Sequence, residues 1–172
     1  MTAFPESEYG AEAGGLSPRQ TAARMAILAL CVLAAFWPAL LCSFVNWDDA
    51  ELVLECPEVR SLSGGNIRRI LAAPVAGAYL PARTVSYAID YALAGGYSPF
   101  WFHLQSVLLH AAGALACYGL ACRLAGARAA FATALLFALH PTRVEGVAWV
   151  SGRKEVLVTL FCLSAAWCFA QI

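Results

Sequence analysis

Charged residues are scarce in this chain. Lys and Arg together number 11 and Asp and Glu together number 11, whereas 61% of the 172 residues are hydrophobic. Soluble domains typically contain about 25% charged residues and about 45–50% apolar residues. The composition therefore excludes an ordinary water-soluble core and is typical of a multi-span membrane protein.

An excess of positive charge is also missing. The formal net charge at pH 7 is zero, and no basic stripe with interleaved aromatic residues occurs along the chain. A protein that binds nucleic acid needs such a stripe because it must neutralise a phosphate backbone. Nucleic acid is therefore excluded as a partner.

The seven cysteines include no Cys-x-x-Cys pair and no His/Cys spacing typical of a zinc site. All of them except Cys56 lie within apolar stretches, where small side chains pack. The sequence therefore predicts no structural metal site, and it leaves open whether a divalent ion assists a reaction.

Long uncharged stretches predict membrane spans. No charge occurs in residues 25–47, which is enough for the about 20 residues that a helix needs to cross about 30 Å of hydrocarbon. A cleaved signal peptide is the competing interpretation, but no A-x-A-like site follows. Spans are predicted at about 25–45, 99–124 and 156–172, and a short apolar segment at 129–141 is expected to enter the membrane and stop short.

The remaining segments predict a tail and a loop. Residues 1–24 are expected to form a disordered tail, and residues 25–172 a single helical membrane module. Residues 46–98 carry most of the acids and are expected to lie outside the bilayer core, with amphipathic helices at 66–73 and 81–93. The predicted fold class is all-α, a polytopic membrane helical bundle with these amphipathic helices in a long first external loop.

Basic flanks predict the orientation. Arg19 and Arg24 precede the first span, and Arg123 and Arg128 fill the turn after the second. Loops rich in Lys and Arg stay in the cytoplasm. The loop at 46–98 is therefore expected on the periplasmic or lumenal side.

Two adjacent carboxylates, Asp48 and Asp49, follow the first span directly. A carboxylate at a water boundary can act as a general base for a hydroxyl, a contribution of typically about 10²- to 10⁴-fold, provided that it lies within hydrogen-bond reach. The alternative interpretation is a solvated flank at the end of a helix.

A second charged cluster occupies residues 137–155, between two apolar segments. Charge near hydrocarbon is costly unless it is paired or hydrated, so such a cluster is a candidate site. Arg143, Arg153 and Lys154 are predicted to hold a phosphate, and Glu145 to orient one of them. An interfacial network of ion pairs with snorkelling side chains is the alternative.

Three histidines accompany these clusters. His103 and His110 are two helical turns apart and are expected to share a face that points toward other helices. His140 precedes a proline, which disfavours helical backbone at that position. Each histidine is either a hydrogen-bonded packing residue or a support for the site, and Asp90 is interpreted as structural.

Four motifs occur in an order that resembles one known family. The motifs are Phe44-Val-Asn-Trp-Asp-Asp49, Tyr79-Leu-Pro-Ala-Arg-Thr-Val-Ser-Tyr-Ala-Ile-Asp-Tyr91, His103-Leu-Gln-Ser-Val-Leu-Leu-His110 and residues 137–157. The most specific motif is the last, which contains His-Pro-x-Arg-Val-Glu. From about residue 44 to its end, the chain resembles the transmembrane and tetratricopeptide-repeat-containing O-mannosyltransferase family, of the GT-C glycosyltransferase type.

The resemblance implies a multi-span enzyme in the bacterial inner membrane or the endoplasmic reticulum. Such an enzyme moves a mannose-like sugar from a polyprenyl-phosphate carrier to Ser or Thr hydroxyls of an acceptor protein on the non-cytoplasmic side. By position, one of Asp48 and Asp49 resembles the family's catalytic acid pair. The set from Arg143 to Lys154 resembles its donor-facing segment.

The chain departs from the family in two ways. Gln105 and Ser106 follow His103-Leu where members commonly have Asn, so this face is expected to contact something different. The family also has further spans and helical repeats, so the chain is expected to be an N-terminal fragment that needs them as partners. A transporter or flippase module and a non-catalytic membrane anchor are the alternative functions; transport would need charges at mid-depth, whereas these lie at the ends of segments.

Overall fold

This computed structural model describes residues 16–171, and within them the chain is helical with no β-strand. The all-α prediction is therefore confirmed for this part of the chain. Short helical turns η2 to η5 join the longer helices. The elements are α1 (Pro18–Phe36), η2 (Trp37–Leu41), η3 (Ala50–Leu54), η4 (Pro57–Arg60), α2 (Gly64–Ala72), α3 (Pro81–Ala94), α4 (Pro99–Leu139), α5 (Arg143–Ala148), η5 (Val150–Gly152) and α6 (Arg153–Phe169).

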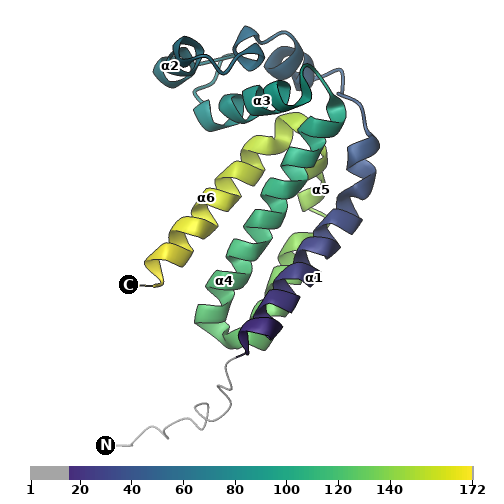
Figure 1. Cartoon of the computed structure of the whole chain (residues 1–172), viewed down its shortest axis with the longest axis vertical. Coiled ribbons are helices and arrows are strands. Elements are labelled where there is room, and N and C mark those ends of the chain that lie inside the picture. The colour runs from purple at the N-terminus through teal and green to yellow at the C-terminus, as the bar shows by residue number, and fades with distance from the viewer. Residues whose placement is uncertain (1–15, 172) are drawn as a thin grey trace, which may run out of the picture.

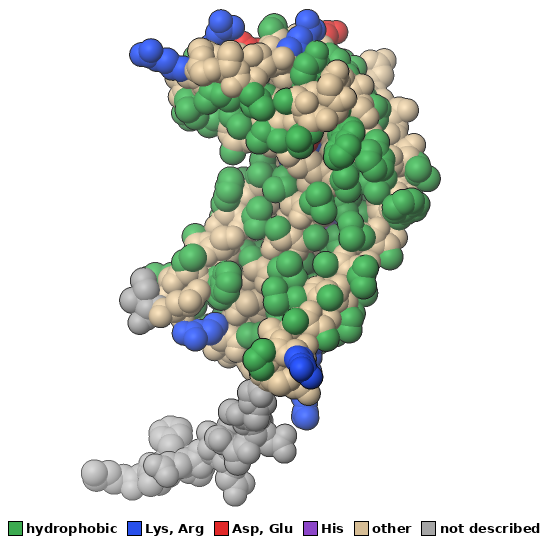
Figure 2. Space-filling view, in the orientation of Figure 1, with side chains coloured by type: hydrophobic (Ala, Val, Ile, Leu, Met, Phe, Trp, Pro, Cys, Tyr) green, Lys and Arg blue, Asp and Glu red, His purple; other side chains and the backbone are tan. Residues whose placement is uncertain are grey.

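The helices form a shaft with a cap. Helices α1, α4 and α6 run side by side, with α4 in contact with both of the others, and α2 and α3 lie across one end (Figure 1). Hydrophobic side chains cover the shaft, whereas Lys and Arg side chains gather at its two ends (Figure 2). This distribution is what a shaft surrounded by hydrocarbon requires.

Helix α1 begins earlier than the sequence analysis expects. Ser17 caps it: the Gln20 N–H donates to Ser17 Oγ, and the Ser17 N–H donates to Gln20 Oε1. Residues 18–24, predicted as part of a disordered tail, therefore form the first turns of α1, whereas residues 1–15 of that tail lie outside the described residues. Leu28 and Val32 are fully buried one turn apart, so this stripe packs into the shaft.

Helix α4 contains a break that explains the short apolar segment at 129–141. Gly126 has φ 76° and ψ 163°, which interrupts the helix. The chain turns back there, so the second part of α4 returns toward the cap (Figure 1). Ala130, Ala134 and Ala138 are fully buried at one-turn intervals, and their small side chains let this returning arm pack closely.

Two of the predicted spans coincide with segments long and apolar enough to cross a membrane, Pro18–Leu41 and Pro99–Leu139. The span predicted at 156–172 corresponds to α6, whose 17 residues lie at the lower limit of the lengths that cross a bilayer. A bundle of more than two spans remains a prediction.

The cap has its own core. Helices α2 and α3 confirm the helices expected at 66–73 and 81–93. Tyr87, Phe102 and Val150 are fully buried in a cluster separate from that of the shaft. Since Val150 comes just before α6, this core attaches the candidate site segment to the cap.

Candidate functional site

Asp49 is a buried carboxylate held from two sides. It is 1% exposed, and its Oδ2 accepts a hydrogen bond from the Val45 N–H at 3.0 Å. Its Oδ1 accepts from the Ser151 N–H at 3.0 Å and from the Ser151 hydroxyl. These bonds join the loop after η2 to the turn before α6, 102 residues later. The orientation of the carboxylate is therefore fixed by the fold.

Asp48 lies beside it in a different environment. Its side chain is half-buried and forms no hydrogen bond or ion pair within residues 16–171. The two acids, adjacent in sequence, thus lie in different surroundings. Of the two, Asp49 lines the cavity described next.

That cavity is mainly apolar and has a volume of about 620 Å³. Asp49, His103 and Glu145 supply its ionisable groups. Both ring nitrogens of His103 are buried there without a well-formed hydrogen bond, although the backbone of Ser43 and Ala148 lies near the imidazole, and Nε1 of Trp149 is buried without a partner. A buried polar atom without a partner costs stability, so these nitrogens suit a ligand that accepts or donates hydrogen bonds. The apolar cavity is lined by Cys42, Ser43, Val45, Trp47, Asp49, His103, Val144, Glu145, Ala148 and Trp149.

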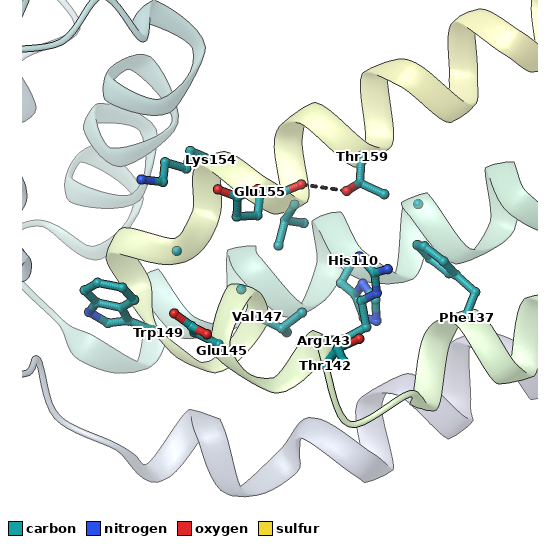
Figure 3. Close-up of a pocket in the computed structure, with 14 residues that line it drawn as sticks. His110, Phe137, Thr142, Arg143, Glu145, Val147, Trp149, Lys154, Glu155 and Thr159 are labelled. Carbon is teal, nitrogen blue, oxygen red and sulfur yellow. Dashed lines mark hydrogen bonds between the residues drawn. The ribbon is translucent and has the colours of Figure 1, made fainter.

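A second, polar cavity of about 340 Å³ lies on the other side of α5. Glu145 and Trp149 line both cavities, so α5 forms the wall between them. Arg143 and His110 lie together at one end, and Lys154 points away from them at the other (Figure 3). The structure therefore places these two predicted cations around one cavity but does not bring their charges together.

Arg143 is available to an anion. Its guanidinium carbon lies 4.8 Å from the ring centroid of Phe137, which is a cation–π contact. Its Nε is buried and makes no hydrogen bond. Glu145 is exposed and forms no ion pair within the described part of the chain, so the expectation that it orients a cation finds no support in the contacts.

Arg153 lies inside the protein, in contrast to its predicted place in an aqueous site. It is fully buried, and its Nη1 lies 2.6 Å from Oδ2 of Asp90. Its guanidinium carbon lies 4.6 Å from the ring centroid of Tyr87. It donates hydrogen bonds to the Ser86 and Ser106 hydroxyls, to Gln105 Oε1 and to the Phe102 carbonyl.

These contacts give Arg153 the role of fastening α6 to α3 and α4. A buried ion pair that loses one partner costs about 3–5 kcal/mol because the other charge stays buried. The contacts also explain the departure at Gln105 and Ser106, which bind this arginine. Phosphate binding by Arg153 would require these acceptors to be given up.

Asp90 completes this interior pair, as the structural interpretation of that residue expects. Burial raises the pKa of its carboxyl to about 7, and the nearby Arg153 guanidinium opposes part of that shift. Burial also raises the pKa of the Tyr87 hydroxyl to about 12. That hydroxyl donates to the Val150 carbonyl at 2.8 Å, so it acts as a fixed donor.

The histidines divide into packing and pocket residues. His103 and His110 are both buried, which confirms that their shared face points toward other parts of the protein. His110 Nε2 lies 2.9 Å from the Ala138 carbonyl oxygen. His140 is exposed, and its Nδ1 lies 2.8 Å from Thr142 Oγ1 in the turn before α5. Of the three, only His103 has two buried ring nitrogens without a well-formed hydrogen bond.

Sequence reasoning missed Ser151, Trp149 and Gly152. A Cβ atom at Gly152 would lie 2.8 Å from the Glu145 carbonyl oxygen and 3.1 Å from Gly146 Cα, so this glycine lets η5 pack against α5. The Trp-Val-Ser-Gly string between two charged groups was the available signal, because a serine and a glycine at a helix start favour a tight turn.

Curated proteins similar to this chain share a description. The chain is 29% identical over 167 residues to protein O-mannosyl-transferase TMTC4 of Mus musculus, covering 77% of this chain and 22% of that protein. It is 37% identical over 98 residues to protein O-mannosyl-transferase TMTC2 of Mus musculus, covering 54% and 11%. It is 29% identical over 177 residues to protein O-mannosyl-transferase F38B6.6 of Caenorhabditis elegans, covering 88% and 24%.

The chain thus spans about a quarter or less of the length of these relatives. No protein-family model and no solved structure matches it. The candidate site is therefore described from the chain's own geometry.

Proposed function

We propose that this chain belongs to the TMTC-like family of protein O-mannosyl-transferases and is part of a membrane glycosyltransferase. The proposed reaction moves a mannose-like sugar from a polyprenyl-phosphate carrier to Ser or Thr hydroxyls of an acceptor protein. One observation carries the proposal: Asp49 is a buried carboxylate, oriented by three hydrogen bonds, at the wall of a cavity of about 620 Å³.

Asp49 is the proposed general base. In a transfer with inversion, the acceptor oxygen attacks the anomeric carbon while the bond from that carbon to the phosphate oxygen breaks. The phosphate leaves with the electron pair, and the proton of the hydroxyl passes to the carboxylate. The donors from Val45 and Ser151 hold the carboxylate before the acceptor arrives, so little reorganisation is needed.

Arg143 is the proposed main ligand of the leaving phosphate. Its guanidinium borders the polar cavity, and its buried Nε has no partner. Since α5 separates this cavity from that of the proposed base, the donor must lie across this wall, past Glu145 and Trp149, which line both cavities. A guanidinium offers a fork that matches phosphate oxygens, and Lys154, at the other end of the cavity, adds a mobile charge. Arg153, which the sequence analysis also predicts as a phosphate ligand, is proposed instead to support the site by holding the start of α6.

His103 and Glu145 are proposed to position the acceptor. The buried ring nitrogens of His103 and the Glu145 carboxylate both line the apolar cavity with Asp49. A hydroxyl group can donate to one and accept from the other. Their place beside Asp49 supports a role in orienting the attacking oxygen rather than in proton transfer.

The sidedness of the site is also a proposal. The loop before η3 and the segment from α5 to the start of α6 lie toward the capped end of the shaft, which supports a single aqueous side for all the candidate residues (Figure 1). By the basic flanks of the spans, this side is periplasmic or lumenal. Acceptor protein, lipid donor, and the remaining spans and repeats of a full-length protein are the proposed partners.

A substitution series in the full-length protein tests the base. Asp49→Asn keeps the size of the side chain but removes its basicity, so sugar transfer from a polyprenyl-phosphate mannose to an acceptor peptide should fall by about 10²-fold or more. Glu51→Gln, which changes a nearby exposed carboxylate, is the control and should retain activity. Full turnover by a correctly inserted Asp49→Asn protein, with loss in Asp48→Asn instead, would transfer the role to Asp48.

A further inference from the structure

A groove between the start of α3 and the first half of α6 adjoins the polar cavity at Lys154 and is otherwise distinct from both cavities described above. It has a volume of about 200 Å³ and includes Arg83 of α3 and Lys154 of α6. In the space-filling view the surface is hollowed where the cap overhangs the shaft on the side of α6 (Figure 2). We call this feature the α3–α6 groove.

Arg83 is the unusual residue of the groove. It is 4% exposed, yet its Nε has no hydrogen-bond partner, and its side chain forms no ion pair within residues 16–171. This contrasts with Arg153, whose guanidinium is surrounded by protein acceptors. The buried Nε of this guanidinium has no acceptor within the described residues, which is costly, so it suits an anion bound in the groove.

Two further features make the same place electropositive. Arg83 lies in the first turn of α3, a helix that begins without a side-chain cap or an acidic residue in that turn. The positive end of the helix dipole therefore adds to the charge of the arginine instead of offsetting it. Lys154, an exposed side chain in the first turn of α6, supplies a second cation.

Below the cations the groove is apolar. Leu157 is buried at its floor, whereas Val158 and Phe161 are each 55% exposed on α6. Tyr79 closes the groove from the cap side, and its hydroxyl donates to the Leu71 carbonyl at 2.9 Å. An apolar lining that also includes two cations, at the junction of cap and shaft, has the polarity of a lipid headgroup boundary.

We propose that the α3–α6 groove binds an anionic membrane phospholipid, with its phosphate between Arg83 and Lys154 and one acyl chain along Val158 and Phe161. The charge pattern selects an anion, and the apolar strip selects a molecule with a hydrocarbon chain. A bound lipid would fasten the cap to α6. The groove shares Lys154 with the polar cavity, whereas Arg83 and Phe161 border neither cavity, so these two residues distinguish lipid binding from sugar transfer.

Native mass spectrometry of the full chain in detergent tests the proposal. Wild type should retain one phosphatidylglycerol that phosphatidylcholine does not replace. Arg83→Gln should reduce the retained fraction about tenfold, because it removes a charge-assisted contact with the phosphate. Arg68→Gln, at an exposed position on α2, is the matched control and should retain lipid as wild type does.

Two further arms keep the outcome decisive. Lys154→Gln and Phe161→Ala change exposed side chains, so they report on the site even if Arg83→Gln does not fold. Both should weaken retention, the first through the phosphate and the second through the acyl chain. Unchanged retention in these variants, or equal displacement of the lipid by inorganic phosphate, would overturn the proposal.

Discussion

The carboxylate of Asp49 accepts hydrogen bonds from both the backbone N–H and the hydroxyl of Ser151. Two residues later, Arg153 pairs with Asp90 on α3. The turn between α5 and α6 is therefore fastened on one side to the loop after η2 and on the other to the cap. The same turn thus holds both the proposed base, Asp49, and the buried Arg153. A substitution at either end of this turn should alter the packing at the other end.

Ser151→Ala should weaken this arrangement without abolishing it. The variant loses the hydroxyl donor but keeps the N–H donor, so the free energy of unfolding should fall by about 1.5–3 kcal/mol, the usual range for a hydrogen bond to a charged group. Thermal unfolding in detergent measures the change. Ser164→Ala, on α6, is the control because no hydrogen bond of its side chain is present in the described chain. Equal effects of the two substitutions would contradict the role given to Ser151.

The stability of the protein should depend on pH through Asp90. Its pKa in the folded protein is about 7, whereas an unfolded Asp has a pKa of about 3.9. Between these values the folded protein binds a proton that the unfolded chain does not. The contribution of Asp90 is therefore greatest below about pH 4 and is lost as the pH rises through 7, by at most about 1.4 kcal/mol per pH unit.

Asp90→Asn isolates this contribution. Denaturation of both proteins at several pH values between 4 and 7 should show wild type losing stability relative to Asp90→Asn as the pH rises. Glu51→Gln should follow wild type, since its side chain is exposed. Parallel profiles for wild type and Asp90→Asn would mean that this carboxyl titrates at its usual pKa.

Gly152→Ala should disturb the wall between the two cavities. The added Cβ would meet the Glu145 carbonyl oxygen at 2.8 Å, so α5 and η5 must separate, and stability should fall by about 1–3 kcal/mol. Gly65→Ala is a control of opposite sign: its Cβ meets nothing within 4 Å, and alanine favours a helix over glycine by about 0.5–1 kcal/mol. Chemical denaturation compares the two variants. An unchanged free energy of unfolding for Gly152→Ala would show that α5 and η5 can separate without cost.

The sequence predicted the helices well where periodicity and charge agreed. The helices at 66–73 and 81–93 have a polar and an apolar side, and both were found. The start of α1 was missed because residues 1–24 as a whole are rich in Gly, Ala and acids and show no periodicity. The pair of Ser17 and Gln20, spaced three apart, was the capping signal that indicated a helix start.

The site was predictable in its residues but not in its pairings. Asp49 and Arg153 stood out because a charge beside apolar residues needs a partner or water. Sequence alone did not show whether each charge has a protein partner or faces water. The partner of Arg153 is 63 positions away, and that of Asp49 is 102 positions away. The packing of α3, α4 and α6 brings these residues together in space. No local sequence pattern predicts that packing.

The bend at Gly126 has a consequence for where the ends of the two arms of α4 lie. Because the arms fold back on each other, the chain leaves the second arm toward the same end of the shaft at which it entered the first (Figure 1). Arg123 and Arg128, which flank Gly126 in sequence, thus belong to the opposite end from the cap (Figure 1). One glycine therefore lets a single helical segment direct both of its termini toward the cap.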